Sequence, residues 1–513
     1  MPICRIKKLH FFRALLISFL LAATLLCASC KGENTFSSGD SLPMDTSPDA
    51  PILRAIIDPA SEVRGVYIAT VYNIDFPSKP NLSTAALKAE MDAILDTVLE
   101  AGLNTVYFQA RPVADALYDS DIFPVSAYLT TDGELTFDPL EYIVEEGHKR
   151  NIFVHAWVNP FRAATSTKWE KIPENSPAKL HPEWTIPYAD GLLYFDPGLP
   201  EVRKLIADGV REIVQNYNVD GILFDDYFYP YPEKDENGVT AGFDDTASFS
   251  LYGGDMSLAD WRRQNVNETV RLVYDTVKSV SEDLRFGIAP FGIWQNDDGK
   301  NGGSPTRGME AYSTVYADPV AWACGGYVDY IAPQIYWRFS SESAPFDELV
   351  RWWNKILDGT GTDLLISHAA HNYEEWTNPK GELKEQVFYG RHELTYRGSI
   401  FYGYDEIRRD AHGIIDELAD VFTDAIIYTE PSPTGLSVQV SSPIAGSSVS
   451  TAETYLIGAS SPDKPLTMNG KPVARTTGGY FSVRVHLVPG KNTFEFVQNG
   501  HTYTYEIYRT TQP

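Results

Sequence analysis

Short apolar runs recur along the middle of the chain, and helical patterns separate them. Each run is too short for a helix and ends in polar or aromatic residues, as buried strands do. We expect strands at 65–71, 105–109, 153–158, 221–225, 286–290, 330–334, 364–367 and 399–403. Strands that alternate with helices pair in parallel, and eight of them predict an α/β fold of the (β/α)8 TIM-barrel type.

The segments between these runs carry helix-start signals. Ser83 precedes one helical pattern as an N-cap, and Asp138 precedes Pro139 at the first position of another. We expect helices at 83–101, 139–150, 200–217, 258–280, 346–357 and 405–422. Long connections follow the third, fourth and fifth strands, on the face where barrel enzymes place their active sites.

The two ends of the chain differ from this middle part. Beyond residue 432, short alternating segments separated by turn signals predict a small all-β sandwich at 433–513, and 62–425 is the predicted barrel. Residues 1–29 combine basic residues with an apolar run, which predicts a lipoprotein signal peptide. Small residues before Cys30 make it the expected lipidation site, with plain secretion as the alternative, and 30–61 is a polar tether.

Composition narrows the classes of partner. The 513 residues carry a formal net charge of -27, so nucleic acid, itself a polyanion, is excluded as a partner. The chain has 30 Tyr and 10 Trp, which suits either a carbohydrate cleft or an aromatic core. No His has metal-ligand spacing to other His, Cys or Asp residues, so neither a metal nor another cofactor is predicted.

The fourth predicted strand ends in two adjacent carboxylates, Asp225 and Asp226. Most glycosidases need two carboxyl groups that face each other across the scissile bond, yet the fifth to seventh strands end without an acid. An adjacent pair fits better with a sugar whose 2-acetamido oxygen is the nucleophile. We assign Asp226 as the proton donor and Asp225 as the group that orients the amide, and expect one of them to keep a raised pKa. The alternative for the pair is a helix cap or turn.

Other polar and aromatic residues near the strand ends are candidates for substrate binding. These residues are Gln109, Arg111, Asn159, Arg162, Tyr227, Trp294, Gln334, Tyr336 and Trp337. The two arginines are equally suited to be structural braces, and His155, inside an apolar strand, is more typical of a hydrogen-bonded core histidine. Asp75, Asp115 and Asp297 stay open as more distant acids.

Several sequence blocks carry a resemblance to a known family. The blocks are residues 64–71, 107–118, 155–162, 196–198, 220–232, 261–267, 287–294 and 333–337. Over residues 62 to about 424 the chain resembles the glycosyl-hydrolase-like 10 family. The resemblance implies a TIM barrel in a secreted or lipid-anchored envelope protein that hydrolyses a β-1,4-linked glycan, with peptide-stripped peptidoglycan as the leading substrate. The sandwich resembles immunoglobulin-like modules of bacterial cell-wall enzymes.

The sequence therefore predicts a lipid-anchored outer-membrane glycoside hydrolase that cleaves an N-acetylated β-linked glycan by acid catalysis with substrate assistance. Two alternatives stay open. One is a retaining glycosidase of a nutritional polysaccharide, with a carboxylate nucleophile. The other is a surface lipoprotein that binds glycan without cleaving it.

Overall fold

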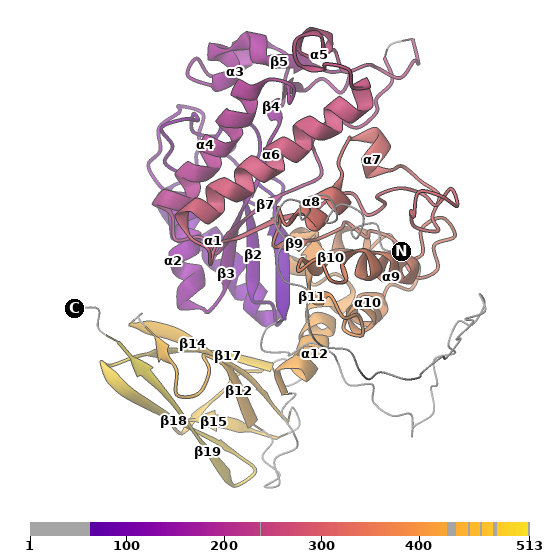
Figure 1. Cartoon of the computed structure of the whole chain (residues 1–513). Coiled ribbons are helices and arrows are strands. Elements are labelled where there is room, and N and C mark those ends of the chain that lie inside the picture. Colours follow the sequence, from indigo (N-terminus) through magenta and orange to yellow (C-terminus); the bar gives the residue numbers. More distant parts are fainter. Residues whose placement is uncertain are drawn as a thin grey trace, which may run out of the picture. The chain divides into compact units, whose positions relative to one another are not determined.

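The computed structural model describes residues 62–235, 237–427, 438–449, 452–461, 464–475 and 480–510. The predicted signal peptide, Cys30 and the tether lie outside these residues. The predicted TIM barrel is confirmed: eight parallel strands close in the order β1-β11-β10-β9-β8-β7-β3-β2 (Figure 1). The strands are β1 (Val63–Ile68), β2 (Thr105–Arg111), β3 (Phe153–Val158), β7 (Gly221–Phe224), β8 (Arg285–Ile288), β9 (Tyr330–Ile331), β10 (Asp363–Ala369) and β11 (Tyr396–Tyr402).

Helices surround the barrel, and most lie where helical periodicity placed them. They are α1 (Thr84–Glu100), α2 (Pro139–Lys149), α4 (Pro200–Asn216), α6 (Leu258–Val280), α8 (Pro319–Gly325), α9 (Phe346–Leu357), α10 (Glu382–Gly390), α11 (Tyr404–Arg408) and α12 (Ile414–Ile427). The side chains of Ser83 and Asp138 cap α1 and α2 as expected. We did not predict α8 and α10, and the single helix expected at 405–422 is two, because Asp410 and His412 adopt positive φ between them.

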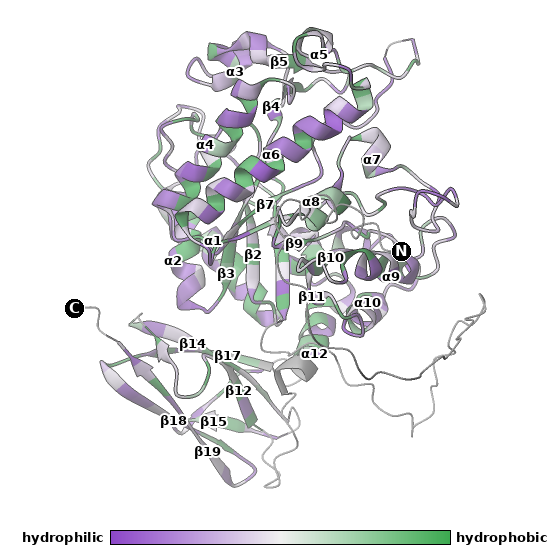
Figure 2. Cartoon of the chain, in the orientation of Figure 1, coloured by the Kyte–Doolittle hydropathy of each residue, from purple (hydrophilic) through white to green (hydrophobic). Residues whose placement is uncertain are grey.

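Each surrounding helix turns an apolar face to the barrel. In Figure 2, α6 carries green and purple bands along its length, as an amphipathic helix does. Its buried residues include Val266, Val270, Val273 and Val277, which follow helical spacing. The barrel strands, covered by helices outside and packed side chains inside, are buried almost throughout.

Aromatic rings fill the inside of the barrel, and glycines make room for them. Tyr67, Tyr107 and Tyr330 belong to one buried cluster with small residues such as Ala289 and Ala332. A Cβ atom on Gly287 would lie 2.1 Å from the ring of Tyr330, so only glycine fits there. The interior of the barrel is thus a packed core.

Extra structure lies in the long connections after β3, β7 and β8. After β3, a small sheet forms from β4 (Arg162–Ala164), β5 (Thr185–Pro187) and β6 (Leu193–Phe195), together with α3 (Pro177–Leu180). The next two connections contain α5 (Thr246–Tyr252) and α7 (Ala311–Thr314). These three connections were predicted to be loops, because the elements in them have only three to seven residues and show too little periodicity to recognise.

The C-terminal part forms two sheets, as predicted. One has the order β12-β14-β17 and the other β13-β19-β18-β15-β16. Their strands are β12 (Val438–Ser442), β13 (Ser448–Val449), β14 (Glu453–Ser460), β15 (Leu466–Met468), β16 (Lys471–Pro472), β17 (Tyr480–His486), β18 (Gly490–Gln498) and β19 (His501–Arg509). Leu456, Phe481, Phe496 and Ile507 belong to one core between them. The immunoglobulin-like character of this part stays a prediction.

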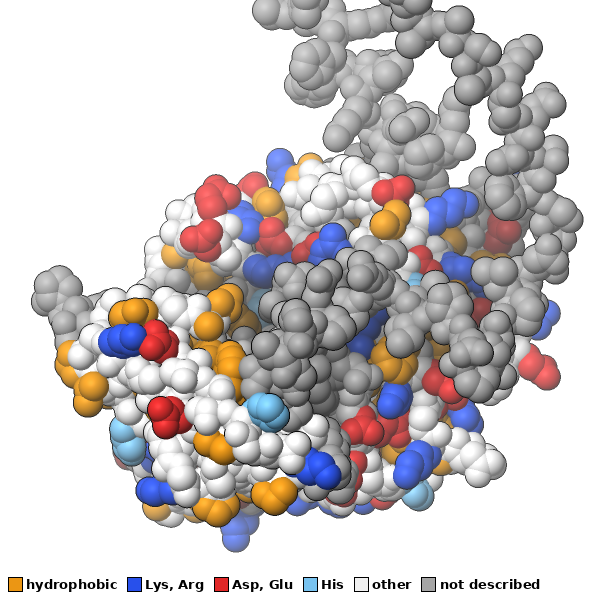
Figure 3. Space-filling view, turned by 90° about the horizontal axis from the view of Figure 1, so that it is seen from below, with side chains coloured by type: hydrophobic (Ala, Val, Ile, Leu, Met, Phe, Trp, Pro, Cys, Tyr) orange, Lys and Arg blue, Asp and Glu red, His pale blue; other side chains and the backbone are white. Residues whose placement is uncertain are grey.

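Charged side chains of both signs are found on the surface, and some are paired in buried places. In the view of Figure 3, acidic and basic side chains are both scattered over the described surface. Inside the barrel domain, Arg391 Nε and Nη2 each donate to an oxygen of the Glu62 carboxylate at 2.8 Å, and both side chains are buried. Within the described ranges, every helix is too short or too polar to cross a bilayer.

Candidate active site

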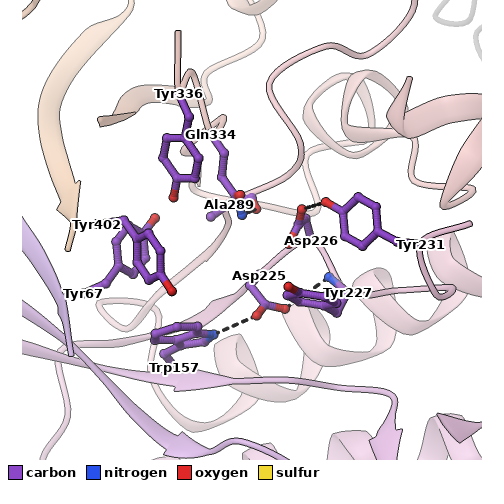
Figure 4. Close-up of a pocket in the computed structure, with 10 residues that line it drawn as sticks. All are labelled: Tyr67, Trp157, Asp225, Asp226, Tyr227, Tyr231, Ala289, Gln334, Tyr336 and Tyr402. Carbon is purple, nitrogen blue, oxygen red and sulfur yellow. Dashed lines mark hydrogen bonds between the residues drawn. The ribbon is translucent and has the colours of Figure 1, made fainter. Parts of the chain in front are cut away.

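A cavity of about 190 Å³ opens at the carboxyl ends of the barrel strands. Ten residues line it: Tyr67, Trp157, Asp225, Asp226, Tyr227, Tyr231, Ala289, Gln334, Tyr336 and Tyr402. They come from six of the eight strands or the loops that follow them. In Figure 4 both carboxyl groups border a space with tyrosine rings on either side. Among the lining residues, Asp225 and Asp226 are the acids, and both are 3% exposed.

Strand geometry explains why Asp225 faces the cavity. Leu223 points into the barrel, as its place in the interior cluster shows, and side chains on a strand alternate. Asp225 therefore has the same orientation one step beyond the end of β7. Its Oδ2 accepts hydrogen bonds from Asn159 Nδ2 at 2.6 Å and Trp157 Nε1 at 3.2 Å, and its Oδ1 accepts one from the Tyr227 backbone N–H at 3.2 Å.

Asp226 has different partners. Its Oδ2 accepts a hydrogen bond from the Tyr231 hydroxyl, drawn as a dashed line in Figure 4. The Gln334 side chain also supports its ionised form by hydrogen bonding. The two acids are therefore not held as a helix cap: the helix that follows, α5, begins only at Thr246.

Burial and proximity raise the pKa of both acids. Burial is the largest cause for each; for Asp225 the neighbouring Asp226 carboxylate is the next, and together they raise the pKa of Asp225 to about 7. Because one carboxyl is already ionised when the other titrates, this value describes the loss of the second proton from the pair and does not assign that proton to either carboxyl. Below about pH 7 the pair therefore holds one proton, which an acid catalyst needs.

Two of the predicted binding residues lie behind Asp225. Asn159 and Gln109 are each 1% exposed, and Gln109 Nε2 donates to Asn159 Oδ1 at 2.8 Å. Gln109 Oε1 in turn accepts from the backbone N–H groups of Thr70 and Val71 at 2.8 and 2.9 Å. Asn159 therefore contacts the cavity acid directly and Gln109 contacts it through Asn159, and both are shielded from the cavity itself.

Arg162 and Tyr227 form one side of the site. The Arg162 guanidinium lies 4.1 Å from the centre of the Tyr227 ring, a cation–π contact. The arginine is 7% exposed. Burial lowers its pKa, but the nearby Asp225 and tyrosines raise it by more, so the pKa of Arg162 is raised. Arg162 thus supplies positive charge beside Asp225 without lining the cavity.

The structure does not bring Arg111 to the cavity. The register of β2 against β3 shifts between Gln109 and Arg111, so a bulge turns the side chain that strand alternation would have pointed inward. Its guanidinium lies 4.5 Å from the Phe123 ring centre, and a Cβ on Gly209 of α4 would be 2.7 Å from its Nη1. No nitrogen of this guanidinium has a hydrogen-bond partner in the described part of the chain.

The two predicted tryptophans occupy different environments. Trp294 is buried, donates to Asp318 Oδ1 at 3.1 Å and stacks on Trp352 of α9 at 5.7 Å between ring centres. Trp337 is half-buried, and its ring meets Phe291 edge-on at 5.6 Å. Phe291 in turn meets Tyr231 of the cavity wall at 6.4 Å, so Trp337 continues a row of rings outward from the cavity.

The remaining candidates lie away from the cavity lining. His155 is a core histidine: its Nδ1 is 3.0 Å from the Tyr330 hydroxyl, and burial lowers its pKa to about 3. Asp75 accepts a hydrogen bond from the Ala69 backbone N–H at 2.7 Å, and burial raises its pKa to about 7. Burial also raises the pKa of Asp115, to about 6. Asp297 is exposed. In the described residues no three His, Cys, Asp or Glu side chains gather as metal ligands would.

Five lining residues, Tyr67, Trp157, Tyr231, Ala289 and Tyr402, are not among the site residues predicted from the sequence, and two of them show why. Tyr67 lies inside a strand. The signal that it faces the barrel interior is its two-residue spacing from Gly65 and Ala69, which puts all three on one face of the strand. Tyr231 lies in the aromatic segment after Asp226 and was passed over because a loop gives no periodicity from which to infer orientation.

Comparisons with known proteins agree with this geometry. The model of a family described as glycosyl hydrolase-like 10 matches residues 62–380. Glycosyl hydrolase YngK of Bacillus subtilis strain 168 is 38% identical over 382 residues, which are 72% of each chain. Glycosyl hydrolase DigH of Escherichia coli K12 is 36% identical over 439 residues, or 80% of this chain and 96% of DigH.

Solved structures are more distant. The PgaB (BpsB) glycoside hydrolase domain of Bordetella bronchiseptica has 12% identity and a TM-score of 0.46, covering 71% of this chain and 98% of that domain. The endo-β-1,4-mannanase of Thermotoga petrophila has 10% identity and a TM-score of 0.40, and the match covers 88% of this chain and 99% of the mannanase chain. With a family model that matches most of the chain and relatives that are 36% and 38% identical over most of its length, the chain belongs to the glycosyl hydrolase-like 10 family and is a glycoside hydrolase.

Proposed function

We propose that this glycosidase cleaves an N-acetylated β-linked glycan of the bacterial cell envelope, with peptide-stripped peptidoglycan strands as its substrate. One observation carries the proposal: the two acids that line the cavity are neighbours at the end of β7. A lining without an acid on the far side supplies no opposed nucleophile. A substrate that brings its own nucleophile, the 2-acetamido group of an N-acetylated sugar, compensates for it.

In the proposed reaction the proton of the pair goes from Asp226 to the leaving glycosidic oxygen as the bond from that oxygen to the anomeric carbon breaks. The acetamido oxygen of the same sugar forms a bond to that carbon, and Asp225 accepts a hydrogen bond from the acetamido N–H. Water then attacks the anomeric carbon, opens the cyclic intermediate and returns a proton to Asp226. Asp225 Oδ1, which has one hydrogen bond from Tyr227, retains room to accept another.

The walls of the cavity suit this substrate. Trp157 and Tyr67 meet edge-on at 5.5 Å, and Tyr336 stacks on Tyr402 at 6.0 Å. Such ring faces are the usual platforms for the apolar faces of sugars. Ala289, a small residue between them in the lining, leaves space for the acetamido methyl group, and Tyr336 is the proposed partner of the acetamido group.

The test is digestion of purified, peptide-stripped glycan strands with the full chain, with products identified by mass spectrometry. We expect Asp226→Asn to lower turnover by about a hundredfold or more, and an aryl glycoside with an acidic leaving group to restore much of it because that group needs no proton. Asp225→Asn should stay inactive on both substrates. A loss below about tenfold for Asp226→Asn would contradict the assignment of the acid.

A second substrate separates this mechanism from a carboxylate nucleophile. Strands whose acetyl groups have been removed chemically should resist cleavage, because they lack the internal nucleophile. Equal cleavage of acetylated and deacetylated strands would indicate a carboxylate nucleophile and contradict substrate assistance. Strands that bind the protein and stay intact would indicate a binding protein.

We also propose that the protein is a lipoprotein of the outer membrane, anchored through Cys30. The support is the sequence alone: basic residues, an apolar run and small residues directly before this cysteine. Metabolic labelling with a radioactive fatty acid should mark the wild-type protein and not Cys30→Ser. Equal labelling of the two would contradict this anchor.

A further inference from the structure

The hydrogen bonds behind the active site form a chain with one direction. It runs from the backbone N–H groups of Thr70 and Val71 through Gln109 and Asn159 to Asp225. We propose that Gln109 and Asn159 are positioning residues that keep Asp225 ionised and so leave the single proton of the pair on Asp226. This inference rests on the proposed function, whose acid is Asp226.

The direction of the chain is fixed at its start. A backbone N–H can only donate, so the Gln109 atom that faces two of them, at 2.8 and 2.9 Å, is its oxygen. The Gln109 amide nitrogen then faces Asn159 and donates to its oxygen at 2.8 Å. The Asn159 nitrogen is left to face Asp225, and at 2.6 Å it donates to Oδ2. Each amide is thereby held in one of its two orientations.

Asp225 consequently has donors on both oxygens. The Asn159 amide and the Trp157 indole N–H donate to Oδ2, and the Tyr227 backbone N–H donates to Oδ1. None of these three N–H groups can accept a hydrogen bond from a protonated carboxyl group. A proton on Asp225 would therefore weaken these hydrogen bonds, because a neutral carboxyl oxygen is a poorer acceptor than a carboxylate, and Arg162 nearby adds positive charge that favours the carboxylate.

Asp226 does not have this restriction. Its hydroxyl partner, Tyr231, can donate to a carboxylate or accept from a carboxylic acid. Gln334 also hydrogen-bonds to the ionised form of Asp226, but the Tyr231 hydroxyl can reverse to accept from a proton held on Asp226, which none of the donors to Asp225 can do. Since Gln109 and Asn159 are each 1% exposed, their effect on a bound glycan passes through Asp225.

The substitution Gln109→Glu tests the direction of the chain with almost no change in size. A glutamate at 109 still accepts from Thr70 and Val71, but its second oxygen cannot donate to Asn159. The side-chain amide of Asn159 is then expected to rotate by half a turn, so that its nitrogen donates to residue 109 and its oxygen faces Asp225. Asp225 must in that case carry the proton to make a hydrogen bond.

The measurement is a carboxyl titration by NMR on the full chain with ¹³C at the aspartate Cγ. Asp225→Asn and Asp226→Asn identify the two signals. Near pH 6, below the loss of the second proton, the wild type should show Asp225 ionised and Asp226 protonated. In Gln109→Glu the order should reverse, and in Asn159→Leu, which removes a donor, the Asp225 midpoint should rise by about one pH unit. The matched control Gln264→Glu, on the exposed face of α6, should leave both signals unchanged.

A protonated Asp225 in the wild type at that pH, or an Asp225 signal that neither substitution moves, would overturn the proposal. Turnover gives the second readout: at pH 6, Gln109→Glu should lower kcat at least tenfold with a smaller change in KM. The titration needs no glycan. If the wild type fails to cleave glycan while the titration behaves as expected, the proposed function fails and the positioning role of the two amides stands.

Discussion

The pair of neighbouring acids should make the barrel less stable above neutral pH, and Asp226→Asn should relieve this. A carboxyl whose pKa is higher in the folded than in the unfolded chain binds its proton more tightly when folded. The free energy of unfolding therefore falls as the pH rises from about 4 to about 7, and the loss is complete above that range. Above pH 7 Asp225 and Asp226 are both charged in the folded state.

The size of the effect follows from the pKa of Asp225. A rise from 3.8 to about 7 corresponds to roughly 4 kcal/mol for the charged form. Burial is the largest cause and the Asp226 carboxylate the second, so removal of the Asp226 charge should return about 1–2 kcal/mol at pH 8. At pH 5, where the wild-type pair already holds a proton, the gain should be small.

Differential scanning calorimetry of the full chain at pH 5 and pH 8 measures this effect. For a barrel of this size the expected gain at pH 8 is roughly 2 °C in the melting temperature of the barrel transition. Asp420→Asn, an exposed aspartate on α12, is the matched control and should show no pH-dependent difference from the wild type. An Asp226→Asn variant that is less stable at pH 8, or equally stabilised at both pH values, would refute the reasoning.

Three further predictions concern the stability of the barrel. Glu62→Ala should lower the free energy of unfolding by about 3 kcal/mol in urea denaturation, because it leaves the Arg391 charge buried without its carboxylate; a loss below about 1 kcal/mol would contradict this. Gly287→Ala should cost about 1–3 kcal/mol through the clash with Tyr330, and Tyr330→Leu in the same chain should recover part of it. Asp75→Asn should stabilise the fold by about 1–3 kcal/mol at pH 8 and less at pH 5, because burial raises the pKa of this carboxyl to about 7; equal melting temperatures at pH 8 would contradict that.

The barrel was predictable because its strands are buried on both sides. Runs such as 221–224 have no polar residue and end sharply, here at Asp225, which marks the end of the strand. The same logic placed Asp225 and Asp226 at the mouth of the barrel, where the structure has them. The small sheet formed by β4, β5 and β6 gave no such signal, since its strands have three residues each.

Orientation was harder to predict than position. Arg111 follows Gln109 by two residues, so strict alternation gives both side chains the same direction, and only the bulge between them separates their environments. Trp294 likewise lies just past a strand end, as a sugar platform would, yet its indole packs on Trp352. A single extra residue in a strand leaves no mark in hydrophobic periodicity.

The fit of Gly287 against Tyr330 has a consequence for the history of the family. Neither residue can change freely while the other stays, because a methyl group at 287 meets the ring and a smaller residue at 330 leaves a hole. Lineages in which position 287 has gained a side chain should therefore have lost the aromatic ring at position 330. Ancestral substitutions at these two sites should have occurred close together in time.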